Sequence, residues 1–293
     1  MHSGKTMTMS PAMPLPPSVP ARERWRQQRI LHDAVESRSR GQEGAFWDRK
    51  ENVNRFFVSA GGSYRERIEC QLASLVYPPG ARVLDIGAGT GTLAVPLALK
   101  GCSVTAIEPS RAMAEMLREY QIQSQAPEIR IIPKRWEDVT ERELDGTYDL
   151  VVASYSLTMP EIEPAIRKMD TACRGRTYLF WFLTQPPRVL AMQDLWRPVH
   201  GEDFFPEPMA DLLWQVLYEM AIYANLSVEP GGPPHLYASL DEAVSDFRSR
   251  LSCRDGEHDA LIRSYLKDRL RPEGTGFLFG GGSLSATIWW EKK

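Results

Sequence analysis

The sequence predicts an α/β protein built on a doubly wound parallel sheet, and three observations support this prediction. Strand-like and helix-like segments alternate from residue 82 onward, and the first strand runs into a glycine-rich turn. The composition is that of a globular protein, with 43% apolar and 25% charged residues. Alternation of this kind is typical of βαβ units, whose strands lie parallel. At 293 residues, the chain can form one large domain or two small ones.

The N-terminal part divides into two segments. Residues 1–20 are rich in Met, Pro and Ser and lack an apolar period, so we expect a disordered tail. Residues 21–77 carry apolar residues spaced at three to four, which predicts an N-terminal helical cap. Within this cap, Gly61-Gly62-Ser63 interrupts the helical pattern, and a further helix over 67–76 ends at Pro78-Pro79-Gly80.

Residues 78–185 are expected to form the core of the fold. The predicted strands are β-branched or apolar runs at 82–86, 103–107, 129–132, 149–153 and 177–183. The predicted helices between them cover 93–100, 111–120 and 161–169. Five strands connected in this way fit a doubly wound sheet.

Residues 186–293 are less regular, and we expect them to complete the sheet and to add helices. An amphipathic helix is predicted over 209–223, followed by a short strand at 226–228. A helical block is predicted over 240–270, and a closing strand over 285–290.

Charge and cysteine content restrict the partners and the compartment. Lys and Arg number 35 against 38 Asp and Glu, so the basic excess typical of a nucleic-acid-binding protein is absent. The cysteines lie far apart without metal-ligand spacing, which predicts free thiols in a reducing cytoplasm and no metal site; they are Cys70, Cys102, Cys173 and Cys253. The richest apolar run, 179–183, is far shorter than the roughly 20 residues of a membrane span, so we expect no membrane partner.

The first predicted strand ends in a glycine-rich turn, Asp85-Ile86-Gly87-Ala88-Gly89-Thr90-Gly91. Glycines at alternate positions remove Cβ atoms where a ligand must approach the main chain, and free N–H groups at the start of the next helix would face that ligand. Two cofactor classes can use such a turn, because Gly89-x-Gly91-x-x-Ala94 also fits a dinucleotide pattern. Asp85 favours the other class, since a carboxylate repels a pyrophosphate but attracts an ammonium or sulfonium group.

Residues 83–91 resemble the first motif of the class I S-adenosylmethionine-dependent methyltransferases, an apolar strand followed by D-x-G-x-G-x-G. This resemblance implies a mostly parallel, seven-stranded Rossmann-like sheet, in which the helical cap and the helical additions build the acceptor site. It implies S-adenosyl-L-methionine as cofactor and S-adenosyl-L-homocysteine as product. The resemblance covers about 82–183 well and the flanks in outline. The cofactor-binding residues that it implies in the turn are Asp85, Gly87, Ala88, Gly89 and Gly91.

A second acidic residue, Glu108, ends the second predicted strand and precedes Pro109. A carboxylate at this position can accept hydrogen bonds from both hydroxyls of an adenosine ribose, and each charge-assisted bond contributes on the order of 1.5–3 kcal/mol. Either nucleoside cofactor would use such a group. We therefore assign Glu108 and Pro109 to the cofactor site.

The resemblance weakens after the third strand. Many family members carry an acidic residue there, but an ungapped comparison puts Arg135 at its place. This leaves Glu137 or Asp138 to bind the adenine amine and Trp136 to pack on the ring. In the family the fourth strand ends beside the transferred methyl group, so we include Ser154 in the cofactor site.

Catalytic residues are harder to predict, because methyl transfer from a sulfonium needs alignment, desolvation and only sometimes a base. Tyr155, just beyond the fourth strand, and His200 are the candidates, with His235 as a third. A lone histidine is more often a packing or surface residue than a catalytic one.

The predicted function is methyl transfer to a small-molecule acceptor, without nucleic acid or membrane as partner, and whether the chain forms a homodimer is left open. Two alternatives remain at this point. One is an NAD(P)-dependent oxidoreductase, and the other is a non-catalytic S-adenosylmethionine-binding protein.

Overall fold

The computed structural model describes residues 19–40, 46–61, 64–253 and 256–292. The predicted disordered tail therefore lies outside the described residues up to residue 18. Helix α1 (Ala21–Arg40) begins where that tail was expected to end, and it is followed by a 3₁₀ turn, η1 (Phe46–Asp48), and by helices α2 (Lys50–Gly61) and α3 (Arg65–Ser74).

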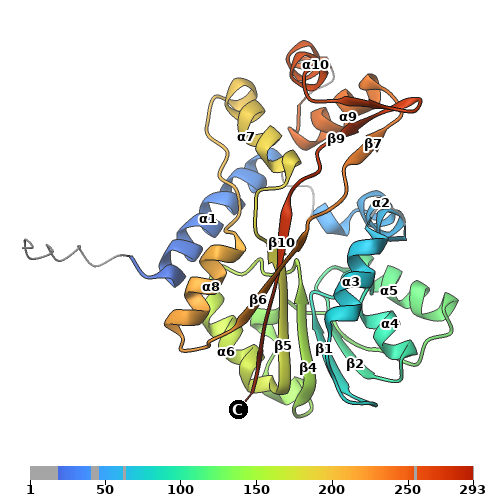
Figure 1. The fold of residues 1–293 in the computed structure, drawn as a ribbon, viewed down its shortest axis with the longest axis vertical. Helices are drawn as coiled ribbons and strands as arrows, with labels where there is room; N and C mark the ends of the chain where they lie inside the picture. Colours follow the sequence, from blue (N-terminus) through green and yellow to red (C-terminus); the bar gives the residue numbers. More distant parts are fainter. Residues whose placement is uncertain (1–18, 41–45, 62–63, 254–255, 293) are drawn as a thin grey trace, which may run out of the picture.

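A seven-stranded sheet forms the centre of the molecule (Figure 1). Its spatial order is β3-β2-β1-β4-β5-β10-β6. The strands are β1 (Arg82–Ile86), β2 (Ser103–Ile107), β3 (Arg130–Ile132), β4 (Tyr148–Ser154), β5 (Cys173–Phe182), β6 (Asn225–Pro230) and β10 (Leu284–Glu291). The first five run parallel, and β10 runs antiparallel to both β5 and β6. The predicted doubly wound, mostly parallel seven-stranded sheet is confirmed.

Both faces of the central strands are buried, as their near-continuous apolar sequences require, whereas the edge strand β6 is mostly exposed. Alternate residues of one strand enter two different cores: Leu84 and Ile86 pack with α1, α6 (Ile162–Ala172) and α8 (Ala210–Glu219). Val83 packs on the opposite face with α4 (Ala94–Leu99) and α5 (Arg111–Gln123). The strand order reverses between β1 and β4, and ligands of such sheets bind at the carboxyl ends of the strands beside that reversal.

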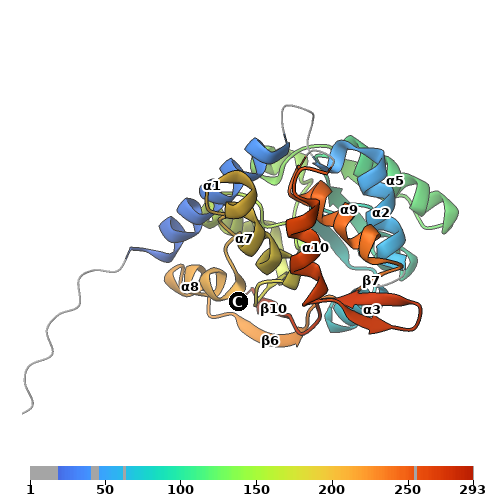
Figure 2. The same cartoon turned by 90° about the horizontal axis from the view of Figure 1, so that it is seen from above.

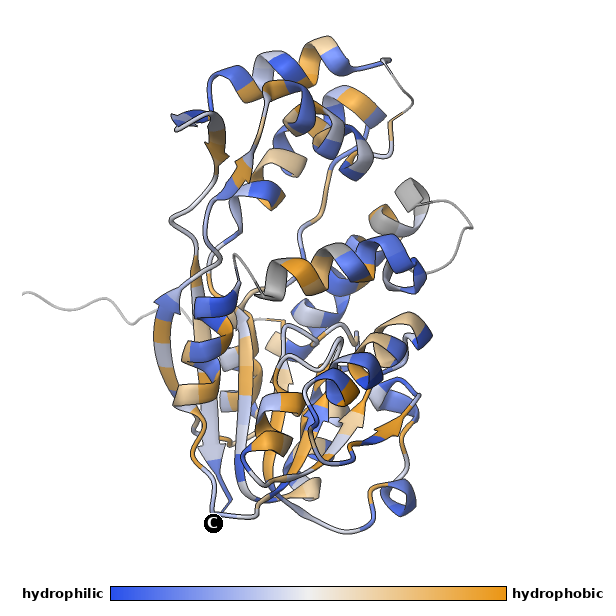
Figure 3. Cartoon of the chain, turned by 90° about the vertical axis from the view of Figure 1, so that its right-hand side faces the viewer, coloured by the Kyte–Doolittle hydropathy of each residue, from blue (hydrophilic) through white to orange (hydrophobic). Residues whose placement is uncertain are grey.

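A second unit lies beyond the carboxyl ends of the parallel strands (Figures 1 and 2). It contains a three-stranded antiparallel sheet and three helices: α7 (Pro187–His200), β7 (His235–Tyr237), α9 (Leu240–Arg250), α10 (Asp259–Lys267), β8 (Arg271–Glu273) and β9 (Gly276–Phe279). Its side chains form a core of their own, which includes Trp196, Phe247 and Ile262. Figure 3 shows this unit above the main sheet, with hydrophobic and hydrophilic residues interspersed along its helices.

The chain passes between the main sheet and this upper unit four times: after β5, after α7, after β6 and before β10. Where the chain leaves β5, the N–H groups of Leu183 and Thr184 donate to the Leu284 carbonyl at 3.0 and 3.1 Å. One residue of α1, Val35, also packs into the upper core. The start of α7 is thereby held over the carboxyl end of β5.

The predicted strands and helices of the core agree closely with the structure, and β1 and β2 have the predicted bounds. Two features of the C-terminal part differ from the prediction. Helix α7 was not predicted, because Pro187 and Pro198 disturb its helical pattern. The expected helical block over 240–270 is two helices, and the three short strands around them have too few residues to show a period.

Candidate functional site

The glycine-rich turn between β1 and α4 adopts a backbone that favours glycine. Gly87, Gly89 and Gly91 have φ angles of +70°, +56° and +82°. A Cβ atom on Gly87 would lie 2.3 Å from the Ser156 Cβ, so the residue after Tyr155 packs directly on the turn. A Cβ on Gly89 would meet no atom within 4 Å. The main chain at Gly89 is therefore open on the side where a ligand can approach.

Glu108 ties this turn to the end of β2. Its Oε2 accepts a hydrogen bond from the Gly89 N–H at 2.7 Å, and its Oε1 accepts one from the Ser110 N–H at 2.8 Å. The residue is 6% exposed. Burial raises the pKa of Glu108, while these two N–H donors oppose the rise and Asp48 adds to it. Each carboxylate oxygen keeps a lone pair for a ligand hydroxyl, so the residue suits the predicted ribose contact.

Asp85 is buried beneath the same turn. The backbone N–H of Ala94 favours its ionised form, but its Oδ2 has no hydrogen-bond partner among the described residues, and neither has the Thr90 Oγ1. Burial first, and then the Glu108 carboxylate, raise the pKa of Asp85 to about 7, against the lowering effect of the Ala94 N–H. Native proteins rarely leave a buried carboxyl oxygen unpaired. A ligand with an ammonium group for the Asp85 Oδ2 and a hydrogen-bonding group for the Thr90 Oγ1 would give both atoms a partner. The residues of the turn therefore fit the predicted cofactor.

The end of β4 brings further side chains to this edge. Ser154 Oγ accepts a hydrogen bond from the Gln71 Nε2 of α3 at 3.0 Å. Tyr155 has a positive φ of +52°, a conformation that non-glycine residues adopt only where their surroundings hold them. Its hydroxyl donates to the Ser285 Oγ of β10 at 2.8 Å. The structure thus brings Ser154 and Tyr155 together with the glycine-rich turn, through the packing of Ser156 on Gly87.

Trp136 and Glu137 are placed differently from the prediction. Trp136 lies in the 3₁₀ turn η2 (Trp136–Asp138), is 3% exposed, and donates from its indole Nε1 to the Ala165 carbonyl of α6 at 3.1 Å. The Lys168 ammonium lies 4.4 Å from the ring centre. The indole is thus a core side chain against α6 instead of a surface for the adenine, and the Glu137 side chain points to solvent.

Neither histidine joins the cofactor turn. His200 ends α7, where its Nε2 is 2.8 Å from the Leu251 carbonyl and its ring centre is 4.2 Å from that of Trp196. His235 lies in β7 with its ring centre 4.4 Å from that of Tyr237. Burial first, and then the Arg188 charge, lower the pKa of His235 to about 4. Both histidines belong to the upper unit.

Sequence reasoning missed the residues that come from distant segments. Gln71, Arg67 and Ser285 all contact the end of β4, but each is more than 80 positions from it in the chain. No motif surrounds any of them. Only the strand order, which puts β10 beside β5, and the packing of α3 at the end of β4 could have indicated them.

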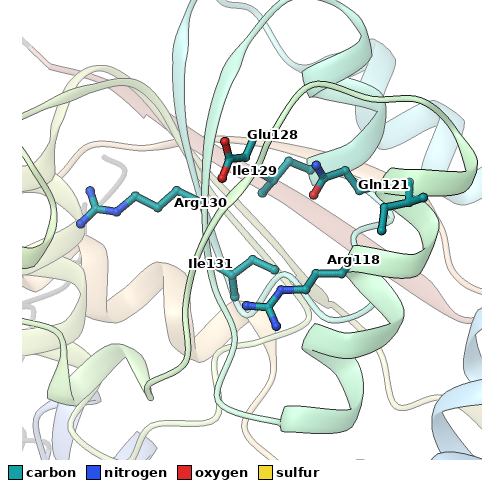
Figure 4. Close-up of a pocket in the computed structure, with 7 residues that line it drawn as sticks. Arg118, Gln121, Glu128, Ile129, Arg130 and Ile131 are labelled. Carbon is teal, nitrogen blue, oxygen red and sulfur yellow. The ribbon is translucent and has the colours of Figure 1, made fainter.

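A surface cavity of about 460 Å³ lies away from this site, between α5 and the start of β3 (Figure 4). Its lining includes Arg118, Glu128 and Arg130. These residues lie at the amino end of β3, opposite the glycine-rich turn. In the described part of the chain, His, Cys, Asp and Glu side chains do not gather in a group that could hold a metal ion. No described helix is both long and apolar enough to cross a membrane.

A family model described as a methyltransferase domain matches residues 83–175. Among curated proteins, an uncharacterized protein of Haemophilus influenzae is 28% identical over 183 residues, which are 62% of this chain and 65% of the relative. The chain spans less than half the length of the other curated relatives that it matches.

Solved structures show the same fold. The YcgJ protein of Bacillus subtilis has a TM-score of 0.55 at 15% identity, covering 78% of this chain and 99% of that one. The plantazolicin methyltransferase BpumL, solved with S-adenosylhomocysteine and a desmethyl analogue, has a TM-score of 0.51 at 9% identity and covers 93% of this chain and 99% of its own. Identities this low establish the likeness of the folds alone.

Proposed function

Residues 83–175 form a methyltransferase domain on the class I S-adenosylmethionine-dependent methyltransferase fold, and on that premise we propose that this chain methylates a small-molecule acceptor. The cofactor is S-adenosyl-L-methionine and the product is S-adenosyl-L-homocysteine. When bound, the cofactor supplies a methyl group on a sulfonium, which makes it electrophilic. The chain's own residues bind and orient the two reactants.

One observation supports the cofactor on which the proposal depends: among the described residues, the buried Asp85 Oδ2 has no partner, and the turn that follows it has open main chain at Gly89. A carboxylate in this position attracts the ammonium of the cofactor's methionine end. It disfavours the pyrophosphate of a dinucleotide, because two negative charges would lie together in a buried site. The oxidoreductase alternative loses its support for this reason.

At the other end of the cofactor, Glu108 accepts hydrogen bonds from the ribose. Its carboxylate is already fixed by the Gly89 and Ser110 N–H groups, so it loses little conformational entropy on binding. Ser154 and Tyr155 lie at the end of β4 beside the same turn and orient the acceptor. Of the two catalytic candidates, Tyr155 is the one that we retain, because His200 is the last residue of α7, about 20 Å along the helix from Pro187, where α7 starts near the end of β5.

A small-molecule acceptor is supported by the upper unit and by the charge. The unit has its own core and covers the carboxyl edge of the sheet, an arrangement that suits an enclosed acceptor. The chain has a net charge of −3, which does not favour a nucleic-acid acceptor.

The test combines binding and turnover. Calorimetric titration of the protein should show micromolar affinity for S-adenosylmethionine and S-adenosylhomocysteine, and no binding of NAD or NADP. Protein incubated with methyl-labelled cofactor and a cell extract should then transfer the label to a compound of low molecular mass. Selective binding of a dinucleotide contradicts the proposal. Binding of S-adenosylmethionine without transfer to any extract component would make the chain a non-catalytic binding protein.

A comparison of two variants tests the choice between Tyr155 and His200. Tyr155→Phe removes the hydroxyl that donates to Ser285 and should lower kcat with unchanged affinity for S-adenosylhomocysteine. His200→Asn should leave kcat near that of the wild type. A loss of kcat in the His200 variant alone would reverse the assignment.

A further inference from the structure

Among the described residues, seven buried side-chain atoms lack a hydrogen-bond partner, and five of them form two groups toward the carboxyl edge of the main sheet. The other two are Thr177 Oγ1 in β5 and Trp196 Nε1 in α7. One group is Asp85 Oδ2 and Thr90 Oγ1 at the cofactor turn. The other lies around the start of α7 and on α3, and consists of Gln185 Oε1, Arg188 Nη2 and Arg67 Nε. None of these atoms has a hydrogen-bond partner among the described residues. The proposed cofactor accounts for the first group and leaves the second unexplained.

Contacts at the edge of the sheet connect the second group to the end of β4. Tyr155 donates its hydroxyl to Ser285, and the neighbouring Leu284 carbonyl accepts the N–H groups of Leu183 and Thr184. The chain then continues directly to Gln185 and into α7. A continuous set of contacts therefore leads from Tyr155 to the unpaired atoms of Gln185 and Arg188 around the start of α7.

Arg67 provides a cation on the Tyr155 side. The Cζ of its guanidinium lies 4.5 Å from the ring centre of Tyr64 and 4.5 Å from that of Tyr155. Contact with aromatic rings holds a guanidinium by its faces and leaves its N–H edge for an anion. The side chain is therefore held in place without an acidic partner.

Arg188 provides a second cation from α7. Burial has the largest effect on the pKa of both His235 and Asp246. The positive charge of Arg188 lies close enough to lower the pKa of each group as well. Asp246 Oδ2 already accepts the Tyr237 hydroxyl at 2.6 Å and the Arg250 Nε at 2.9 Å. His235 remains neutral at pH 7, because its pKa is about 4. Asp246 thus faces two arginines, and Glu242 is a second acid near His235. Arg67 is a further cation on the Tyr155 side of this region.

We propose that the methyl acceptor carries a carboxylate, which binds Arg188 with Arg67 as a second cation, and a hydrogen-bond donor, which pairs with Gln185. This inference rests on the proposed function, because it names the substrate class of the same site. A buried guanidinium N–H is costly to leave unpaired, and a planar carboxylate matches the guanidinium fork. A carboxylate fits better than a phosphate, since the second charge of a phosphate would be repelled by Asp246.

The experiment uses fractionated cell extract, methyl-labelled S-adenosylmethionine and the full chain. The extract is separated into fractions that an anion exchanger retains and fractions that pass through. The retained fraction is tested untreated, after amidation of its carboxylates with carbodiimide and methylamine, and after phosphatase treatment. We expect label transfer to the retained fraction, loss of transfer after amidation, and no change after phosphatase treatment.

Matched variants connect this result to the site. Arg188→Gln should raise the KM for the retained fraction roughly 10- to 100-fold, as expected for loss of a charge-assisted interaction, with unchanged affinity for S-adenosylhomocysteine. Arg197→Gln, on the exposed side of the same helix, is the control and should leave the KM unchanged. Arg188→Lys keeps the charge and should recover part of the loss. Unchanged affinity for S-adenosylhomocysteine also shows that each variant is folded.

Several results would overturn the inference. Transfer only to the unretained fraction, or transfer that survives amidation, contradicts a carboxylate. Loss of transfer after phosphatase treatment assigns a phosphate instead. An equal KM in wild type and Arg188→Gln removes Arg188 from the site. Binding of S-adenosylhomocysteine without transfer to any fraction would instead contradict the proposed function, and the inference would fail with it.

Discussion

The cofactor edge and the acceptor edge of this protein are built in opposite ways. The cofactor edge takes its functional groups from one short stretch, Asp85 to Ser110, where a turn and two strand ends carry them all. The proposed acceptor edge takes Arg67, Tyr155 and Arg188 from three segments that lie far apart in the chain. A ligand bound by a local motif can be recognised in a sequence, whereas a ligand bound by assembled side chains cannot.

The two edges also differ in charge. Buried carboxyl groups, Asp85 and Glu108, characterise the cofactor edge, and arginines characterise the acceptor edge. This separation suits a reaction between a cationic cofactor and an anionic acceptor, because each reactant meets opposite charge in its own half of the site. Four variants test whether cofactor affinity depends on the residues of this one stretch and not on Trp136.

The largest effect is expected from Gly87→Ala. Its Cβ would lie 2.3 Å from the Ser156 Cβ at a φ of +70°, so the turn must move. Displacement of a binding loop by about 1 Å can cost roughly 100-fold, and we expect a loss of that size in affinity for S-adenosylhomocysteine by calorimetry. Gly80→Ala is the control, since Gly80 has a φ of +68° but open space around it. Equal losses in both variants would show that backbone strain, and not contact with β4, explains the glycine.

Glu108→Ala should have the next largest effect. It removes the acceptor of two backbone N–H groups, at 2.7 and 2.8 Å, together with the proposed ribose contact. Charge-assisted bonds of this kind contribute about 1.5–3 kcal/mol, so affinity for S-adenosylhomocysteine should fall roughly 10- to 100-fold. Glu119→Ala, an exposed acid on α5, should change nothing in the same titration. Full affinity in the Glu108 variant would remove this residue from the site.

Asp85→Asn should weaken cofactor binding by about tenfold, because one charge interaction of about 1.4 kcal/mol is lost. The same change should raise the stability of the ligand-free protein above neutral pH. The pKa of Asp85 is about 7 in the folded protein against an ordinary 3.8, so the native state binds this proton more tightly than the unfolded state. The free energy of unfolding therefore falls as pH rises from about 4 through 7. This cost reaches at most about 4 kcal/mol above pH 7.

The asparagine variant does not ionise and escapes that cost. Urea denaturation of the ligand-free protein should find Asp85→Asn more stable than the wild type at pH 8, with no such gain at pH 4. A variant that is less stable at pH 8 would mean that Asp85 is not a destabilising buried acid.

The smallest effect on cofactor affinity is expected from Trp136→Phe. The indole packs in the core and donates to Ala165, so the change should lower the free energy of unfolding by about 1–3 kcal/mol. Affinity for S-adenosylhomocysteine should stay within error of the wild type. A clear fall in affinity at unchanged stability would restore the adenine contact that the sequence suggested.

The sequence predicted the central sheet well because its strands are buried on both faces and bounded by turn residues. Strand β1 shows this, with apolar residues up to the glycine-rich turn and 0% exposure at Val83 and Leu84. The upper unit was predicted poorly. Its strands have three or four residues, too few for a period, and the helix of Arg188 contains prolines that usually end helices.

Trp136 illustrates the same limit within the core. Its place in the chain, after the third strand, agreed with an adenine contact, but the direction of the indole depends on α6, which lies 26 positions further along. A residue's distance from a motif fixes where its main chain lies. The neighbours that its side chain meets are decided by packing between elements.

The sequence by itself determined the strands of the parallel half, the cofactor turn and its two acids, because each depends on neighbours within a few residues. The tertiary structure alone decided the strand order and the surroundings of the proposed acceptor. The order of β5, β10 and β6 brings Ser285 to Tyr155 and holds α7 above them. Burial then leaves Arg188 and Arg67 with unpaired N–H groups. Whether a buried charge is paired is a property of the whole assembly, since its partners come from every segment that packs around it.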